Sequence, residues 1–267
     1  MSARPGDDEG AAVRYEVAGE VATLTLNRPD ARNRLDAEGM GLLAALLRRA
    51  AEDDGVRVVV LTGTGSTFCA GADLSAAVSG DADGFAGSGP SAMVDVLVSL
   101  LDHPKPTIAR VQGHVAGGGN GLVAACDIAV ASAAARFAFS EVRLGVAPAV
   151  ISVVCLQVMD RRSAQELFLT GERVDADRVQ RAGLVTAVVP ESGLDDAVAA
   201  YTGQLLAGGP HALAGTKDLL RRIPTLARAD AFAEASVVSA ALFSSAEARE
   251  GMTAFLEKRP AGWAPAG

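Results

Sequence analysis

The stretch GHVAGGGNG, from Gly113 to Gly121, is the densest run of glycines in the sequence. It lies between a strand-like segment, Pro106 to Val111, and a helical segment of small residues, Leu122 to Cys126. Glycines at a turn from strand to helix allow the backbone to approach a ligand, and they leave the first N–H groups of the helix free to stabilise negative charge. Such turns also serve close packing alone, so the stretch by itself leaves both interpretations open.

Two further segments could carry chemistry. FCAGADL, from Phe68 to Leu74, follows a predicted strand and places Asp73 where it can cap a helix; taken alone, it is typical of an ordinary loop. FAFSEVRLGV, from Phe137 to Val146, holds the carboxylate of Glu141 in an otherwise apolar stretch. Either this glutamate pairs with an arginine on the surface, or its apolar surroundings raise its pKa toward the range that proton transfer needs.

The rest of the N-terminal half alternates between strands and helices. The pattern predicts a β-hairpin from Val13 to Leu26 and a helix from the N-cap Asp36 to about Glu52. The stretch from Ser75 to Pro90 is rich in Gly, Ser, Ala and Asp, and we expect a mobile loop there, followed by a helix from Ser91 to Asp102. Strands that alternate with helices indicate parallel-sheet units.

Helices dominate the C-terminal third of the sequence. From Ser163 onward the pattern is mostly helical, and three helical stretches cover about 212–222, 226–242 and 246–257. We therefore expect a core domain over residues 13–200 and a helical region over 201–259, with flexible tails at 1–12 and 260–267.

Composition and charge exclude several classes of function. The 267 residues are 49% hydrophobic and carry a formal net charge of −8, which disfavours nucleic acid as a partner. No apolar run reaches the roughly 18 residues of a membrane span, and the N-terminus lacks the apolar stretch of a signal peptide. The three cysteines have no metal-ligand spacing. We expect a cytoplasmic protein with reduced thiols, no metal and no membrane association.

In this order, the three segments resemble those of the crotonase (enoyl-CoA hydratase/isomerase) superfamily. Weaker similarities to that superfamily extend the resemblance from Val13 to Arg259, at Asn27–Pro29 with Arg32–Leu35, Leu169–Glu172 with Ala182–Val185, and Glu250–Met252 with Phe255–Arg259. Within the superfamily, the sequence pattern most resembles that of bacterial methylglutaconyl-CoA-hydratase-like members. The resemblance implies an α/β fold with a crotonase-type ββα spiral core and a C-terminal helical trimerisation region.

The resemblance also assigns roles to residues. It implies that the backbone N–H groups of Ala72 and Gly118 bind the thioester oxygen as it becomes an enolate, with Glu141 as the acid/base. It implies an acyl-CoA thioester as substrate, coenzyme A as part of that substrate and no separate cofactor, and a homotrimer or homohexamer. The expected substrate and CoA contacts are Arg28, Arg32, Ala70, Gly71, Asp73, Leu74, Gly117, Arg143, Phe255 and Lys258.

One position departs from the pattern of the family's hydratases. These enzymes commonly use a second glutamate two residues after the glycine triplet, where this sequence has Gly121. Asn120 could orient a water molecule but is a negligible base, and we expect only packing or hydrogen bonding from His114. A lone Glu141 fits hydration of an enoyl-CoA, isomerisation between the 3-enoyl and 2-enoyl esters, or a catalytically silent acyl-CoA-binding protein. The resemblance of the local sequence around Glu141 to that subgroup favours hydration.

Overall fold

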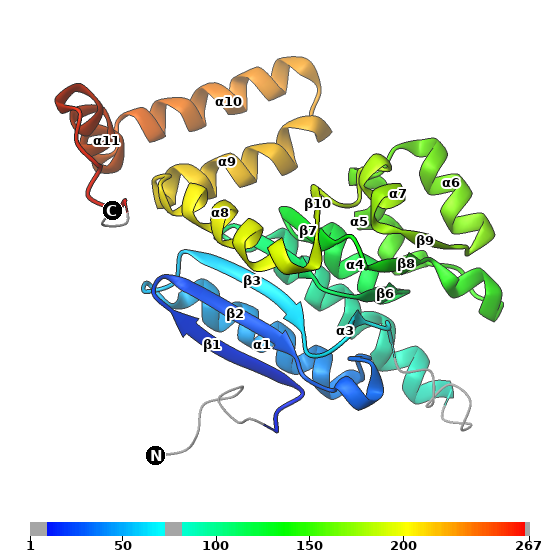
Figure 1. The fold of residues 1–267 in the computed structure, drawn as a ribbon. Helices are drawn as coiled ribbons and strands as arrows, with labels where there is room; N and C mark the ends of the chain where they lie inside the picture. The colour runs from blue at the N-terminus through cyan, green and yellow to red at the C-terminus, as the bar shows by residue number, and fades with distance from the viewer. Residues whose placement is uncertain (1–9, 73–81, 265–267) are drawn as a thin grey trace. The chain divides into compact units, whose positions relative to one another are not determined.

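The computed structural model describes residues 10–72 and 82–264, with the backbone alone between 82 and 89. The described chain forms two compact units. The first runs to His103 and resumes from Thr107 to Val198; the second joins residues 104–106 to everything from Ala199 onward. Among the described residues, both sheets belong to the first unit, and the second consists mainly of helices (Figure 1).

A six-stranded sheet forms the larger layer of the first unit, in the order β1-β2-β3-β5-β7-β10. β1 and β2 form the predicted antiparallel hairpin, and all later neighbours pair in parallel. All six residues of β3 are buried, as expected for a parallel strand covered on both faces. The strands of this sheet are β1 Val13–Ala18, β2 Val21–Leu26, β3 Val58–Gly63, β5 Thr107–Val111, β7 Ile128–Ser132 and β10 Ala187–Val189.

A second, four-stranded sheet has the order β4-β6-β8-β9. β4, β6 and β8 pair in parallel, whereas β9 is antiparallel to β8. Each strand has only three residues: β4 Thr67–Cys69, β6 His114–Ala116, β8 Arg136–Ala138 and β9 Arg173–Asp175. Sequence patterns did not predict these strands, because three residues are too few to display an alternation of period two.

The path of the chain explains why the two sheets occur together. Three times, a strand of the large sheet is followed at once by a strand of the small one, as β3 by β4, β5 by β6 and β7 by β8. Because β4, β6 and β8 are parallel neighbours, their carboxyl ends lie at one edge of the small sheet. The fold therefore brings together the residues that follow these strands, which are 70–72, 117–118 and 139–141.

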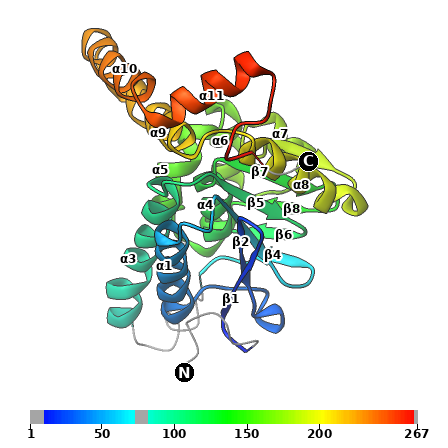
Figure 2. The ribbon, with the colours of Figure 1, turned by 90° about the vertical axis from the view of Figure 1, so that its left-hand side faces the viewer.

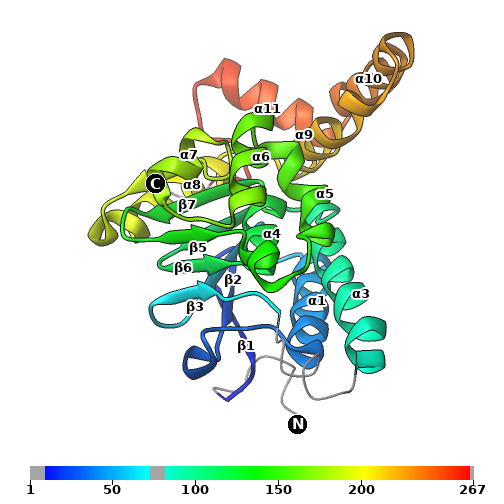
Figure 3. The ribbon, with the colours of Figure 1, turned by 90° about the vertical axis from the view of Figure 1, so that its right-hand side faces the viewer.

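Helices pack against the sheets of the first unit. α1 and α3 lie side by side (Figures 2 and 3), with Leu43 and Leu47 of α1 and Val96 and Leu100 of α3 in the core. Asp36 caps α1 as predicted, since its side chain accepts a hydrogen bond from the N–H of Gly39 at 2.8 Å. The helices that begin in this unit are α1 Ala37–Glu52, α3 Ala82–Leu101, α4 Gly118–Ala125, α5 Ala149–Val158, α6 Arg161–Thr170, α7 Ala176–Arg181 and α8 Leu194–Leu206.

The prediction of a loop up to Pro90 was wrong for its second half. α3 begins at Ala82 and contains Pro90, although a proline inside a helix removes one backbone hydrogen bond. The apolar residues after Pro90 are buried against α1 and hold this helix in place, which outweighs the local cost. The first half of the predicted loop, 75–81, lies outside the described residues.

The second unit is built from the end of α8 and the helices α9 Pro210–Arg222, α10 Arg228–Phe243 and α11 Ala246–Glu257. Arg222 of α9 joins Asp218 on its own helix to Glu234 of α10, at 2.6 and 2.8 Å. Glu247 of α11 accepts hydrogen bonds from the first N–H groups of α9. The three helical stretches that the sequence predicted correspond to α9, α10 and α11.

Candidate active site

The turns after β4 and β6 meet at the edge of the small sheet. Gly71 has a φ of 90°, and its carbonyl accepts a hydrogen bond from the N–H of Leu35 at 2.9 Å. A methyl group added at Gly118 would lie 3.7 Å from the Cα of Gly71 and 3.8 Å from the amide nitrogen of Ala72. Gly118 is the first residue of α4, so its N–H has no acceptor within the helix. The backbones of the two predicted oxyanion residues are therefore neighbours.

Gly117 lies beside the carboxylate of Glu141. Its φ of 50° is in the left-handed region that favours glycine. A methyl group at Gly117 would lie 3.6 Å from Oε1 of Glu141, in ordinary van der Waals contact with that carboxylate. The N–H of Gly117 donates to the carbonyl of Ala138, at the end of β8, at 3.2 Å.

Glu141 belongs to a 3-10 turn, η2 (Ser140–Leu144), that follows β8. Its side chain is half-buried, and Oε2 is a buried atom without a hydrogen-bond partner among the described residues. Burial raises the pKa of Glu141 above the ordinary value of a glutamate. The same carboxylate helps to raise the pKa of the thiol of Cys155, after burial itself. A carboxyl group with an elevated pKa beside the turn at Gly117 has the properties of a proton-transfer group.

The space beside Gly121 is occupied by apolar side chains. A methyl group at this position would lie 2.6 Å from Cγ2 of Ile151 in α5 and 3.5 Å from Cδ2 of Leu97 in α3. Met93 covers the neighbouring turn, because a methyl group at Gly118 would lie 2.7 Å from its Cε. Sequence patterns gave no signal for Met93, Leu97 or Ile151, which are ordinary apolar residues on helices.

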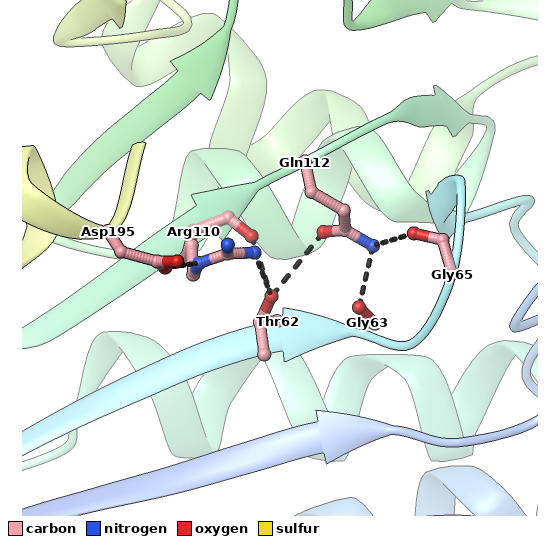
Figure 4. A network of polar contacts seen from close by, with 6 residues as sticks. All are labelled: Thr62, Gly63, Gly65, Arg110, Gln112 and Asp195. Carbon is pink, nitrogen blue, oxygen red and sulfur yellow. Dashed lines mark hydrogen bonds and ion pairs between the residues drawn. The ribbon is translucent and has the colours of Figure 1, made fainter. Parts of the chain in front are cut away.

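A network of side chains holds the turn that leads into β4. The Nε2 of Gln112 donates to the carbonyls of Gly63 at 2.7 Å and Gly65 at 3.3 Å (Figure 4), and to that of Thr67 at 3.0 Å. The Nδ2 of Asn33 donates to the carbonyl of Thr67 at 2.6 Å. The strand before Ala72 is thus fixed from two sides.

The predicted CoA-binding arginines have different surroundings. Arg28 pairs with Asp36 and with Glu38, and the hydrogen bond that it donates to Asp36 is the main reason why its pKa is raised. The Nε of Arg143 donates to the carbonyl of Thr170 at 3.1 Å. Both side chains therefore have partners within the protein.

Arg32 instead lines a basic cavity of about 790 Å³. Arg136, Arg173 and His114 line it too, together with the predicted contact Ala70. Arg173 lies 2.6 Å from the Nδ1 of His114, so the histidine makes the expected hydrogen bond. Partial burial and the charges of the three arginines lower the pKa of His114.

The remaining four predicted contacts lie outside the described residues or in the second unit. Asp73 and Leu74 lie outside the described residues. Phe255 and Lys258 belong to the second unit, where Phe255 is 82% exposed and Lys258 ends α11 in a left-handed conformation. Within residues 10–72 and 82–264, no three His, Cys, Asp or Glu side chains could together hold a metal ion. The described helices include none that is both long enough and apolar enough to cross a bilayer.

Comparison with known proteins places these features in a family. The family model for enoyl-CoA hydratase/isomerase matches residues 16–265. The chain is 32% identical to the enoyl-CoA hydratase EchA19 of Mycobacterium tuberculosis over 94% of its length and 96% of the relative. It is 33% identical to the short-chain-enoyl-CoA hydratase of Clostridium acetobutylicum, with 92% and 95% covered. The chain therefore belongs to the enoyl-CoA hydratase/isomerase family, the crotonase superfamily.

Solved structures agree with this assignment. The crystal structure of an enoyl-CoA hydratase of Mycobacterium smegmatis superimposes with a TM-score of 0.89 at 36% identity, over 94% of this chain and 98% of that one. The predicted α/β crotonase fold is thereby confirmed, and the relatives named as hydratases support an enzyme of that kind.

Proposed function

We propose that the protein adds water across the 2,3 double bond of an enoyl-CoA thioester, with Glu141 as its single acid/base. The observation that carries this proposal is the position of the Glu141 carboxylate, close to Gly117 and with a pKa raised by burial. An ionised glutamate of raised pKa is a stronger base than an ordinary one, and its protonated form can return the proton near neutral pH.

The proposed reaction uses the two backbone amides and the carboxylate together. Glu141 takes a proton from water as the water oxygen bonds to C3 of the substrate. The electrons of the double bond then move onto the thioester oxygen, where the N–H groups of Ala72 and Gly118 stabilise the enolate. Protonated Glu141 delivers the proton to C2. Removing one donor of this kind from an enzyme typically slows the reaction by about 10²–10³-fold.

The chemistry around the site fits the two ends of such a substrate. Met93, Leu97 and Ile151 provide an apolar wall for an acyl chain next to the amides. Coenzyme A carries several phosphate charges, and the basic cavity around Arg32 offers cations for them in a protein of net charge −8. Coenzyme A acts here as part of the substrate, without a further cofactor.

A second candidate is isomerisation of a 3-enoyl-CoA to its 2-enoyl isomer. It is favoured by the packing at Gly121, where Ile151 takes up the space that a second carboxylate would need. One base suffices for this reaction, because Glu141 can remove the proton from C2 and return it to C4 while the amides hold the dienolate.

Three substrates distinguish the candidates. The protein is incubated with crotonyl-CoA, 3-methylglutaconyl-CoA and a 3-enoyl-CoA while the absorbance of the conjugated thioester is followed. Hydration lowers the signal from the first two, whereas isomerisation raises it with the third. A silent acyl-CoA-binding protein does neither. We expect Glu141→Gln to abolish turnover while it retains CoA binding; wild-type turnover in this variant would overturn the assignment of Glu141.

A further inference from the structure

Asn120 joins the two turns that carry the proposed chemistry. It lies in the first turn of α4 and is fully buried. Its Nδ2 donates to the carbonyl of Ala138, the last residue of β8, at 2.8 Å, and to the carbonyl of Gly117 at 3.3 Å. The N–H of Gly117 donates to the same Ala138 carbonyl. One side chain thus ties the turn before Gly118 to the strand that leads to Glu141.

Burying this amide is unfavourable for stability. Oδ1 of Asn120 is a buried atom without a hydrogen-bond partner among the described residues. A buried acceptor left without a donor costs free energy, and an apolar side chain of the same shape would avoid that cost. A polar residue retained at such a cost usually serves the site. Here the part of the side chain that is used is its N–H₂ group.

We propose that Asn120 is a positioning residue that fixes the distance between the oxyanion amide of Gly118 and the carboxylate of Glu141. This inference rests on the proposed function. Asn120 binds the carbonyls of Gly117 and Ala138. Gly118 directly follows Gly117, and Glu141 lies three residues after Ala138, so only short stretches of backbone separate these two carbonyls from the reacting groups. A displacement of about 1 Å between such groups can slow a reaction by 10²-fold.

Two nearly isosteric variants test the role of the donor group. Asn120→Leu removes both hydrogen bonds and the unpartnered oxygen, so we expect a fold at least as stable as the wild type, a kcat lower by about 10–100-fold and a KM within about threefold. Asn120→Asp places a carboxylate opposite two carbonyls when it is ionised, and restores a donor when it is protonated. Its kcat relative to the wild type should therefore rise as the pH falls.

Dividing the kcat of each variant by the wild-type kcat at the same pH isolates the effect of protonating the new carboxylate at position 120. Glu141 and Cys155 are present in every variant, so the ratio removes the titration that they share with the wild type. An ionised carboxylate at position 120 would raise the pKa of Glu141, which lowers the ratio at low pH and therefore cannot produce the predicted rise. Asn27→Asp is a matched control, because Asn27 also donates to a backbone carbonyl, that of Ala11, but outside the site; its ratio should not rise at low pH. Wild-type kcat in Asn120→Leu, or an Asn120→Asp ratio that stays flat as the pH falls, would overturn the proposal.

A measurement without turnover separates this inference from the proposed function. A dimethylaminocinnamoyl-CoA ester absorbs at longer wavelength when its thioester carbonyl accepts strong hydrogen bonds. We expect Asn120→Leu to bind this ester with at most half of the wild-type red shift. If the wild type binds it but turns over no enoyl-CoA, the proposed function fails while the red shift still tests Asn120. An unchanged red shift in Asn120→Leu contradicts the inference alone.

Discussion

The carboxyl group of Glu141 links catalysis to stability through one property, its raised pKa. Because the base must be ionised, kcat/KM should fall as the pH is lowered through this raised pKa, at a pH above the ordinary glutamate value of about 4.3. A pH profile of kcat/KM measures this limb directly. A profile that stays level down to about pH 4 would show that a different group, or none, limits the rate.

The same shift predicts the stability of Glu141→Gln. A carboxyl whose pKa is higher in the folded than in the unfolded protein favours folding when protonated, and this contribution is lost as the pH rises through the folded pKa. Glutamine never ionises, so the variant should melt at a higher temperature than the wild type at pH 7.5. The difference should vanish near pH 3, where both states of the wild type are protonated. Thermal melts at the two pH values provide the comparison.

The packing at Gly121 predicts that a second carboxylate cannot simply be added. A side chain here begins 2.6 Å from Cγ2 of Ile151, so Gly121→Glu should lose about 1–3 kcal/mol of stability through overpacking. Adding Ile151→Ala makes room and should restore part of the loss in denaturant unfolding. Gly41→Glu is the matched control, because no atom lies within 4 Å of its added carbon. Equal stability of the two glutamate variants would contradict this account.

At the scale of elements, the order of segments in the sequence predicted more than any single segment. The hairpin, the capped α1 and the C-terminal helices follow from local patterns. The short strands β4, β6 and β8 do not, because their pairing in the small sheet, rather than an alternation along the chain, makes them strands. The same holds for Ile151, whose position against Gly121 arises only when α5 packs on α4. Glu141 could be chosen from the sequence; the packing around it could not.

The basic cavity on the small sheet predicts a contact with the phosphates of coenzyme A. Arg32 lines this cavity with Arg136 and Arg173 from β8 and β9. Arg32→Ala should raise the KM for crotonyl-CoA by about 10-fold, the loss expected for one charge-assisted contact. With crotonyl-pantetheine, which lacks the phosphates of coenzyme A, the variant and the wild type should have the same KM. An equal rise with both substrates would mean that Arg32 supports the fold instead.

At the scale of the whole molecule, the net charge of −8 opposes an anionic substrate, so the local cations must act at short range. Salt should then have two opposing effects: it screens the repulsion from the protein as a whole, and it weakens the contacts to the arginines. In Arg32→Ala one of these arginine contacts is already missing, so salt has less left to weaken. The KM of the variant should therefore rise less steeply with ionic strength than that of the wild type.

α10 presents apolar side chains that the described part of the chain leaves exposed. Phe232, Val237 and Phe243 are 67–71% exposed, and no residue of this helix is buried. Exposed apolar surface on this scale is typical of an interface, and we propose that α10 contributes to a homotrimer or a homohexamer. Val237→Glu should then lower the mass measured by light scattering, because a charge buried between subunits is costly. Arg228→Glu introduces the same side chain at the polar start of the helix, with an even larger change of charge, and should leave the mass unchanged. A wild-type protein that is monomeric at micromolar concentration would exclude this role for α10.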